Sequence, residues 1–312
     1  MLHAAVPHKQ SAAAVEPPRA HPLTASVAAV DRAVKLLSFR VIGDSRLPAD
    51  PRLPAEPQLA DWIECDHVLS DSAFFARWRS KVVRWLTEQH AVPAQAAVPE
   101  KTTGGYVLQW YLIVPSYIGA LLFHSARRVP TLAPQQLSFR LDLAVLREVA
   151  LRPGRFWCLP DDPDAGHPDA VPVPDEAALG TVLRDQVIAH ASRFLTVYGR
   201  QVRFGRRTKW ATVTDVLDSG LLLAGRAFGS PQAGASDARL VLGGGETPPK
   251  KPMTSASTIC ELTDDRGRTH WTRRRGSCCF LYALPGIERP CASCPRLAAA
   301  DRARIYGTLD QA

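Results

Sequence analysis

The 312-residue chain contains neither of the two glycine-rich signatures that bind nucleotides. No G-x-G-x-x-G follows an expected strand, and the pattern G-x-x-x-x-G-K-[ST] is missing. Three consecutive glycines, residues 243–245, lie in an expected loop and have neither the lysine nor the helix that a phosphate site needs. We therefore expect no nicotinamide or flavin domain in this chain, and any electrons that it uses must come from outside.

Signatures of hydrolases and of nucleic-acid-binding proteins are also missing. The nine histidines form no H-E-x-x-H motif, and no G-x-S-x-G elbow is present. The net charge of +8 would suit nucleic acid, but no helix-turn-helix, zinc-finger or RNA-binding signature accompanies it. The basic charge instead favours an acidic protein, an anionic metal chelate, or peripheral contact with an anionic membrane.

Long hydrophobic runs are few. Residues 106–123 form the most apolar stretch, and Gln109, Pro115 and Gly119 interrupt it. This pattern predicts a buried helix, broken or kinked near Pro115, rather than a membrane span. Residues 1–23 contain no apolar run, so no signal peptide is expected and the cytoplasm is the predicted location.

Four of the seven cysteines lie within seventeen positions near the C-terminal end. Cys278 and Cys279 are adjacent, eleven residues follow, and Cys291 and Cys294 form a C-x-x-C motif. Adjacent side chains point to opposite faces of an extended strand, so both sulfurs of the first pair can serve one site only if the backbone turns there. Two pairs of thiolates match the ligand set of a [2Fe-2S] cluster. Structural zinc and a redox-active disulfide pair remain open alternatives at this point.

A longer pattern surrounds these cysteines, R-x-x-C-C-x-x-Y-x-L-P followed by a loop and C-x-x-C. It resembles the FhuF-type ferric-siderophore reductases, and the matching positions are Arg275, Cys278, Cys279, Tyr282, Leu284, Pro285, Cys291 and Cys294. The loop between the second and third cysteines is one residue longer than is usual in that family, and Pro290 is the expected insertion. A loop tip absorbs one extra residue at little cost.

The resemblance implies a function and a set of partners. The four cysteines would hold a [2Fe-2S] cluster that passes one electron to a ferric siderophore, with the hydroxamate type expected, and so releases ferrous iron. An external donor such as a ferredoxin or reduced flavin would supply the electron. Two other hypotheses stay open: a non-catalytic protein with a structural four-cysteine zinc site, and an iron–sulfur electron carrier without siderophore specificity.

Two basic blocks are candidate docking surfaces. Arg273, Arg274 and Arg275 directly precede the cysteines, and we expect them to favour the reduced, more negative form of the cluster and so raise its potential. The body of the family resembles the C-terminal domain of aerobactin-type siderophore synthetases, which implies a siderophore cleft. The second basic block contributes the expected lining residues of that cleft, Arg206, Arg207 and Trp210.

The predicted fold class is α+β, with a mostly helical body, a small antiparallel sheet and a C-terminal cysteine-rich segment. Periodicity predicts helices over residues 24–39, 74–86, 175–200, 208–228 and 301–309, and strands over residues 137–142, 145–149 and 155–159. Residues 257–261 and 269–273 are expected to pair as a hairpin. Four parts follow: a disordered tail (1–23), a siderophore-binding body (24–230), a flexible linker (231–256) and the hairpin with the cluster segment (257–312).

Overall fold

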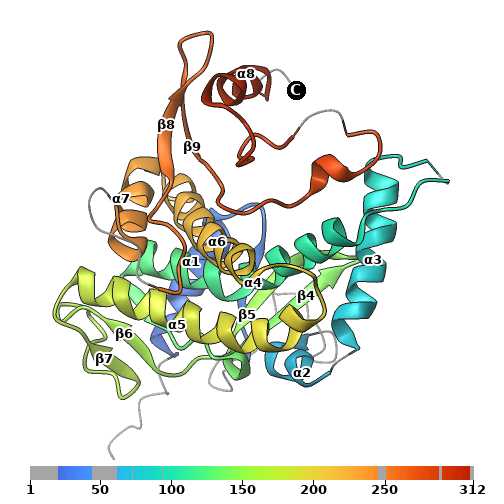
Figure 1. Ribbon diagram of the computed structural model, residues 1–312. Coiled ribbons are helices and arrows are strands. Elements are labelled where there is room, and N and C mark those ends of the chain that lie inside the picture. The colour runs from blue at the N-terminus through green and yellow to red at the C-terminus, as the bar shows by residue number, and fades with distance from the viewer. Residues whose placement is uncertain are drawn as a thin grey trace, which may run out of the picture.

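A computed structural model describes residues 20–43, 62–71, 73–93, 95–244, 251–287 and 290–309. Most of the predicted tail, residues 1–19, and most of the proline-rich stretch before Trp62 lie outside the described residues. The fold is α+β, with long helices packed on small sheets and a separate C-terminal lobe above them (Figure 1). The helices are α1 (Pro22–Ala33), α2 (Cys65–Ser70), α3 (Phe74–Gln89), α4 (Glu100–Ala126), α5 (Glu176–Val197), α6 (Arg206–Ala227), α7 (Pro231–Leu242) and α8 (Ala299–Leu309).

Helix α4 is the core of the body. It has 27 residues and continues through Pro115 without a break, although a proline inside a helix costs about 3 kcal/mol or more. Close packing on several sides offsets that cost, because α3, α5 and α6 all contact α4. By length and composition α4 could cross a membrane, and 78% of its apolar window is buried inside the protein. The prediction of a buried helix is confirmed; of the predicted break or kink near Pro115, the break is wrong, because the helix is continuous there.

The main sheet is mixed rather than antiparallel. Its strands are β1 (Ser38–Val41), β2 (Ile63–Glu64), β4 (Leu137–Asp142) and β5 (Val145–Leu151), in the order β1-β5-β4-β2, and β1 runs parallel to β5. A second sheet joins β3 (Arg128–Pro130), β6 (Phe156–Cys158) and β7 (Ala170–Pro172). The first two residues of β1, 38 and 39, fall inside the range that periodicity predicted as the first helix. Helix α1 ends earlier because the Asp31 carboxylate accepts a hydrogen bond from the Phe39 amide at 2.8 Å, which fixes the turn into the strand.

Two predicted boundaries are wrong. Helix α1 begins at Pro22, and both Pro22 and Leu23 are buried, so the end of the predicted tail belongs to the core. The predicted flexible linker contains α7, which begins at a Ser230 cap whose hydroxyl accepts from the Ala233 amide at 3.2 Å. Most of the residues that it buries before its last turn are small, Gly234, Ala235 and Ala238, and its larger apolar side chains come only at the end, Leu240–Leu242, so the sequence shows no apolar stripe along the helix. A Cβ added to Gly234 would come within 2.5 Å of an α6 carbonyl, which shows how closely the two helices cross.

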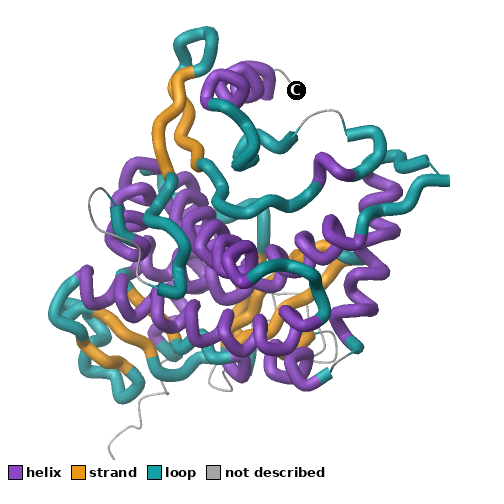
Figure 2. Tube along the Cα trace, viewed as in Figure 1, coloured by secondary structure: helices purple, strands orange, loops and turns teal. Residues whose placement is uncertain are grey.

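The C-terminal lobe, residues 259–309, begins with the predicted hairpin. Strands β8 (Ile259–Thr263) and β9 (Thr269–Arg273) pair antiparallel, and α8 lies beside them (Figure 1). The Tyr306 hydroxyl lies 2.5 Å from the Thr272 hydroxyl, and the Tyr306 ring packs against His270. From β9 the chain returns across the body as a long loop before it reaches α8 (Figure 2). This stretch, residues 275–297, is called the ligand loop below because it carries the four clustered cysteines.

Candidate metal centre

The ligand loop brings the four cysteines together against the body. Cys279 and Cys294 are buried, Cys278 and Cys291 are half-buried, and all four are free thiols. The thiols of Cys279 and Cys291, from opposite ends of the loop, are hydrogen-bonding partners. The Cys294 amide donates to the Cys291 carbonyl at 2.9 Å, which closes the C-x-x-C turn. Sulfurs from both halves of the motif therefore converge on one place, as a cluster requires.

A buried carboxylate on α6 holds the beginning of the ligand loop. Asp215 is 2% exposed and accepts hydrogen bonds from the Gly276 amide at 2.8 Å and the Ser277 amide at 2.7 Å. The Ser277 hydroxyl donates to the same carboxylate at 2.5 Å. Arg273 and Arg275 lie at ion-pair distances of 3.7 and 3.9 Å from it. The predicted turn before the cysteine pair is thus present, and its cause is the carboxylate rather than small residues alone.

Phe280 fixes the chain just after the cysteine pair. It has a φ of 59°, a left-handed conformation that is uncommon for a residue with a side chain. Its carbonyl accepts from the Thr102 hydroxyl at 3.0 Å, and its ring stacks on Phe204 with centroids 5.5 Å apart. The Phe280 amide donates to the Cys278 sulfur at 3.3 Å. The sharp turn and these contacts direct both adjacent cysteines toward one site.

Helix α4 forms the floor of the site. Gly105 allows the close approach, because a Cβ there would lie 3.3 Å from the Cys279 carbonyl oxygen. The next residue is Tyr106, and burial raises the pKa of its hydroxyl to about 12, with the neighbouring thiols of Cys279 and Cys291 adding to the rise. Gln109 accepts a hydrogen bond from the Arg275 guanidinium at 2.8 Å. Residues of α4 therefore position both the loop backbone and the cation beside the thiols.

Arg275 is the cation that faces the thiols. The pKa of Cys279 is lowered to about 6 because its thiolate accepts a hydrogen bond from Cys291 and lies near the Arg275 charge. The pKa of Cys291 is raised, because it donates that hydrogen bond and is buried. Arg275 is 7% exposed and its Nε has no hydrogen-bond partner among the described residues. A buried guanidinium with spare donor capacity beside four thiols suits a site that holds a negatively charged group.

The three consecutive arginines have different surroundings. Arg273 and Arg275 are 9% and 7% exposed and turn toward Asp215, so their burial contradicts the expectation that they form a docking surface. Arg274 is exposed and donates to the Pro295 carbonyl at 3.1 Å. It alone of the three is open to a partner. Strand alternation from Arg273 to Arg275 explains the difference, since residues two apart share a face.

The second predicted docking group lies at the beginning of α6. Arg206 and Arg207 are exposed, and Trp210 is half-buried and packs against the core. The first turn of α6 has no acidic residue, so the positive end of the helix dipole adds to these charges. The same helix carries Asp215, so this basic face adjoins the ligand loop. A role in docking for these residues stays a prediction.

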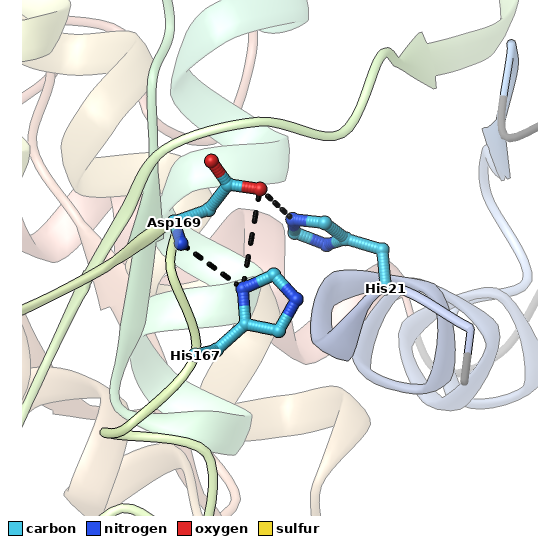
Figure 3. A group of neighbouring side chains, drawn as sticks. All are labelled: His21, His167 and Asp169. Atoms are coloured by element: carbon cyan, nitrogen blue, oxygen red, sulfur yellow. Dashed lines mark hydrogen bonds and ion pairs between the residues drawn. The ribbon is translucent and has the colours of Figure 1, made fainter. Parts of the chain in front are cut away.

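A second group of metal-ligand types lies far from the cysteines in sequence. His21, His167 and Asp169 have ligand atoms within 4.8 Å of one another (Figure 3). His21 Nδ1 accepts from the Leu23 amide at 3.2 Å, and His167 Nδ1 accepts from the Asp169 amide at 3.1 Å. In the neutral ring the other nitrogen of each histidine then carries the proton. The group is therefore better suited to capping α1 and pairing with the carboxylate than to binding a metal.

The cysteine site fits a [2Fe-2S] cluster in the chemistry of its donors. Four thiols in two pairs supply two ligands for each of two irons. Cys278, Cys279, Cys291 and Cys294, from the two ends of one loop, are the residues that would hold the cluster, and this ligand set stays a prediction. Pro290, the expected insertion, follows Glu288 and Arg289, which lie outside the described residues, so the position of the extra residue stays a prediction.

Comparison with known proteins supports this assignment. Residues 275–296 match the model of the FhuF 2Fe-2S C-terminal domain. No curated protein matches the chain significantly. One solved structure, the aerobactin synthetase IucC from a hypervirulent pathotype of Klebsiella pneumoniae, is 14% identical with a TM-score of 0.32. The alignment covers 51% of this chain and 28% of that enzyme, and at this TM-score it assigns neither fold nor function. The matched segment has the expected donors in the expected order, so residues 275–296 of this chain are similar to the FhuF-type [2Fe-2S] domain.

Proposed function

We propose that the protein reduces ferric siderophores by one electron and thereby releases ferrous iron. The observation that carries this proposal is the pairing of Cys279 and Cys291, thiols from the two halves of the cysteine motif, beside a buried guanidinium, on a segment that matches the FhuF 2Fe-2S domain. Ferric iron is a hard cation that oxygen ligands hold very tightly, and ferrous iron is held far less tightly. One electron therefore releases the metal while the organic ligand stays intact.

In this proposal the bound cluster supplies the ability to accept and donate single electrons. The four cysteines hold it, Arg275 stabilises its negative charge, and Asp215 fixes the loop that carries the first two ligands. An external donor, such as a ferredoxin or a reduced flavin, loses one electron for each ferric ion that becomes ferrous. We place the protein in the cytoplasm, where peripheral contact of its basic surface with the inner face of the cell membrane is also expected.

The proposal is tested by single-turnover oxidation. The holoprotein is reduced anaerobically with dithionite, freed of excess reductant and mixed with a ferric siderophore. We expect the visible absorption of the oxidised cluster to return while a ferrous-specific chelator traps one Fe²⁺ for each cluster oxidised. The matched control is the same siderophore loaded with Ga³⁺, which accepts no electron. Failure of every ferric chelate tried to oxidise the reduced protein would support a plain electron carrier instead.

Arg275→Gln is expected to lower the midpoint potential of the cluster by on the order of 60 mV. That value corresponds to a tenfold change in a one-electron equilibrium. The physical reason is that the reduced cluster carries one more negative charge, and Arg275 is the buried cation beside the thiols. Arg274→Gln serves as the control, because Arg274 is exposed and bonds only a loop carbonyl among the described residues. A protein-film or dye-mediated titration measures both, and equal potentials in the two variants would refute a specific role for Arg275.

A further inference from the structure

A cavity of about 250 Å³ lies at the joint between the body and the C-terminal lobe. Tyr117 of α4 and Ser219 of α6 line it from the body, and Thr272 of β9 and Tyr306 of α8 line it from the lobe. Ser293, the residue directly before Cys294, completes the wall. The cavity is therefore built from both parts of the chain, and the C-x-x-C turn forms one side of it.

Its lining is rich in hydrogen-bond donors. The Tyr117 and Ser219 hydroxyls lie 3.2 Å apart, and those of Thr272 and Tyr306 lie 2.5 Å apart. In each pair one hydroxyl hydrogen is used between the partners, and the second hydroxyl keeps a hydrogen that it can donate to a ligand. No carboxylate is among the described residues that line the cavity. The hydroxyl pairs can thus donate to oxygen atoms of a bound molecule.

Two guanidinium groups add positive charge to the same wall. Arg273 is 9% exposed, and its Nη1 has no hydrogen-bond partner among the described residues, although the Asp215 carboxylate lies 3.7 Å away. Arg226 is exposed and donates to the Trp271 carbonyl. Asp215 and Asp218 face Arg273 and partly balance its charge, whereas Arg226 has no carboxylate at ion-pair distance in the described parts of the chain. Arg226 is therefore the cation that a ligand in the cavity would meet.

The position of the cavity relative to the thiols matters for electron transfer. The Ser293 carbonyl accepts from the Arg275 amide at 3.0 Å, so the cavity wall and the cation of the metal centre share a backbone hydrogen bond. Cys291 and Cys294, on either side of the turn, are half-buried and buried. A molecule in the cavity would contact the turn that carries two of the four ligands without touching the sulfurs themselves.

We propose that this cavity binds ferric chelates that carry a net negative charge, with carboxylate or catecholate oxygens directed at Arg226 and the hydroxyl pairs. The inference rests on the reductase function proposed above and adds the class of substrate. Guanidinium groups pair strongly with such oxygens, whereas a neutral tris-hydroxamate offers them no charge. The cavity is smaller than the roughly 300–1,000 Å³ typical of sites that enclose a ligand. It therefore receives one face of the chelate, which is sufficient for outer-sphere transfer of one electron to Fe³⁺.

Gallium chelates test the binding step apart from the chemistry. The oxidised holoprotein is titrated with three Ga³⁺ complexes, a citrate-based dihydroxamate, a tris-catecholate and a neutral tris-hydroxamate, and dissociation constants are measured by calorimetry. We expect at least one anionic complex to bind about tenfold or more tightly than the neutral one. The complex that binds more tightly identifies carboxylate or catecholate as the recognised group. Binding of the neutral complex with equal or higher affinity would overturn the proposal.

Variants of a cavity residue test whether the preference for anionic complexes arises from the cavity. Arg226→Gln is expected to weaken the anionic complex about fivefold or more and to leave the neutral complex unchanged, because one charge-assisted contact is lost. Arg226→Lys keeps the charge and should recover part of the affinity. Arg147→Gln, an exposed arginine on β5 that does not line the cavity, is the matched control and should bind like the unaltered protein. The cluster spectrum confirms that each variant is folded and loaded.

The outcomes separate this inference from the proposed function. If ferric chelates oxidise the reduced protein but Arg226→Gln leaves the binding of anionic gallium complexes unchanged, the reductase function stands and the assignment of the cavity is wrong. If anionic complexes bind and lose affinity in Arg226→Gln, the cavity assignment stands even where turnover is slow. If no gallium complex binds at concentrations that support reduction, the cavity assignment fails.

Discussion

Cys279→Ala is expected to give a colourless protein with almost no bound iron. Cys279 is buried, and its thiol is paired by a hydrogen bond with that of Cys291 from the other half of the motif, so its loss removes a donor from the centre of the site. Without it one iron would keep a single cysteine ligand, and a [2Fe-2S] cluster needs two on each iron. Iron and sulfide analysis together with the visible spectrum measures the loss.

Cys260→Ala is the matched control for that experiment. Cys260 lies in the same lobe, on β8, but it is exposed and its partner across the hairpin is Thr272 rather than another cysteine. The control should retain the colour and the iron content of the unaltered protein. Equal loss of iron in both variants would indicate that the lobe as a whole, rather than a defined set of ligands, had been damaged. Retention of a full cluster by Cys279→Ala would refute its assignment as a ligand.

The sequence alone was enough to name the four candidate ligands of the metal centre, and their assignment as ligands stays a prediction. Covalent spacing kept all four cysteines within one loop, and the donor chemistry and the family pattern both pointed to two irons. The hairpin that precedes the loop and the long helices of the body followed from periodicity in the same way. What these features share is that neighbouring residues determine them, so the information is local.

The parts that the sequence reading missed depend on contacts between distant segments. Asp215 lies more than sixty positions before the serine that it binds, so no pattern of neighbouring residues connects the two. A partial signal was present, because Asp215 and Asp218 lie three residues apart in the middle of α6, among apolar residues that are buried, and both hold the C-terminal part of the chain. Helix α7 was missed because its packing face uses glycine and alanine, which hydrophobic periodicity weights weakly.

Composition alone does not predict which of the three consecutive arginines are buried. As a sequence they form one basic block. In the fold, Arg273 and Arg275 are buried and lie near Asp215, whereas Arg274 is exposed to solvent. Only one of the three charges therefore lies on the surface. Exposed positive charge at the ligand loop comes from Arg274 and from Arg296 within the loop, and the exposed arginines at the beginning of α6 and Arg226 near its end add to it.

Asp215→Ala is expected to cost the apoprotein about 3–5 kcal/mol of unfolding free energy, because it removes the carboxylate that two buried arginines share. In the loaded protein the same change releases the Gly276 and Ser277 amides from their anchor, so the turn before the cysteine pair loses its fixed geometry. We therefore expect faster loss of the cluster as well as lower stability. Urea unfolding measures the first effect, and the decay of visible absorption measures the second.

Asp237→Ala separates these two effects. Asp237 on α7 is also buried, accepts two hydrogen bonds from Arg127 at 2.9 and 3.0 Å, and lies 2.6 Å from His124, but it does not contact the ligand loop. Its loss should also lower stability, but by less than Asp215→Ala, because Arg127 is half-buried and keeps its ion pair with Glu176. It should not change the rate at which the folded protein loses its cluster. If both variants lose the cluster at the same rate under conditions where both are folded, Asp215 acts only through global stability. If only Asp215→Ala loses it faster, the carboxylate on α6 positions the ligands of the metal centre.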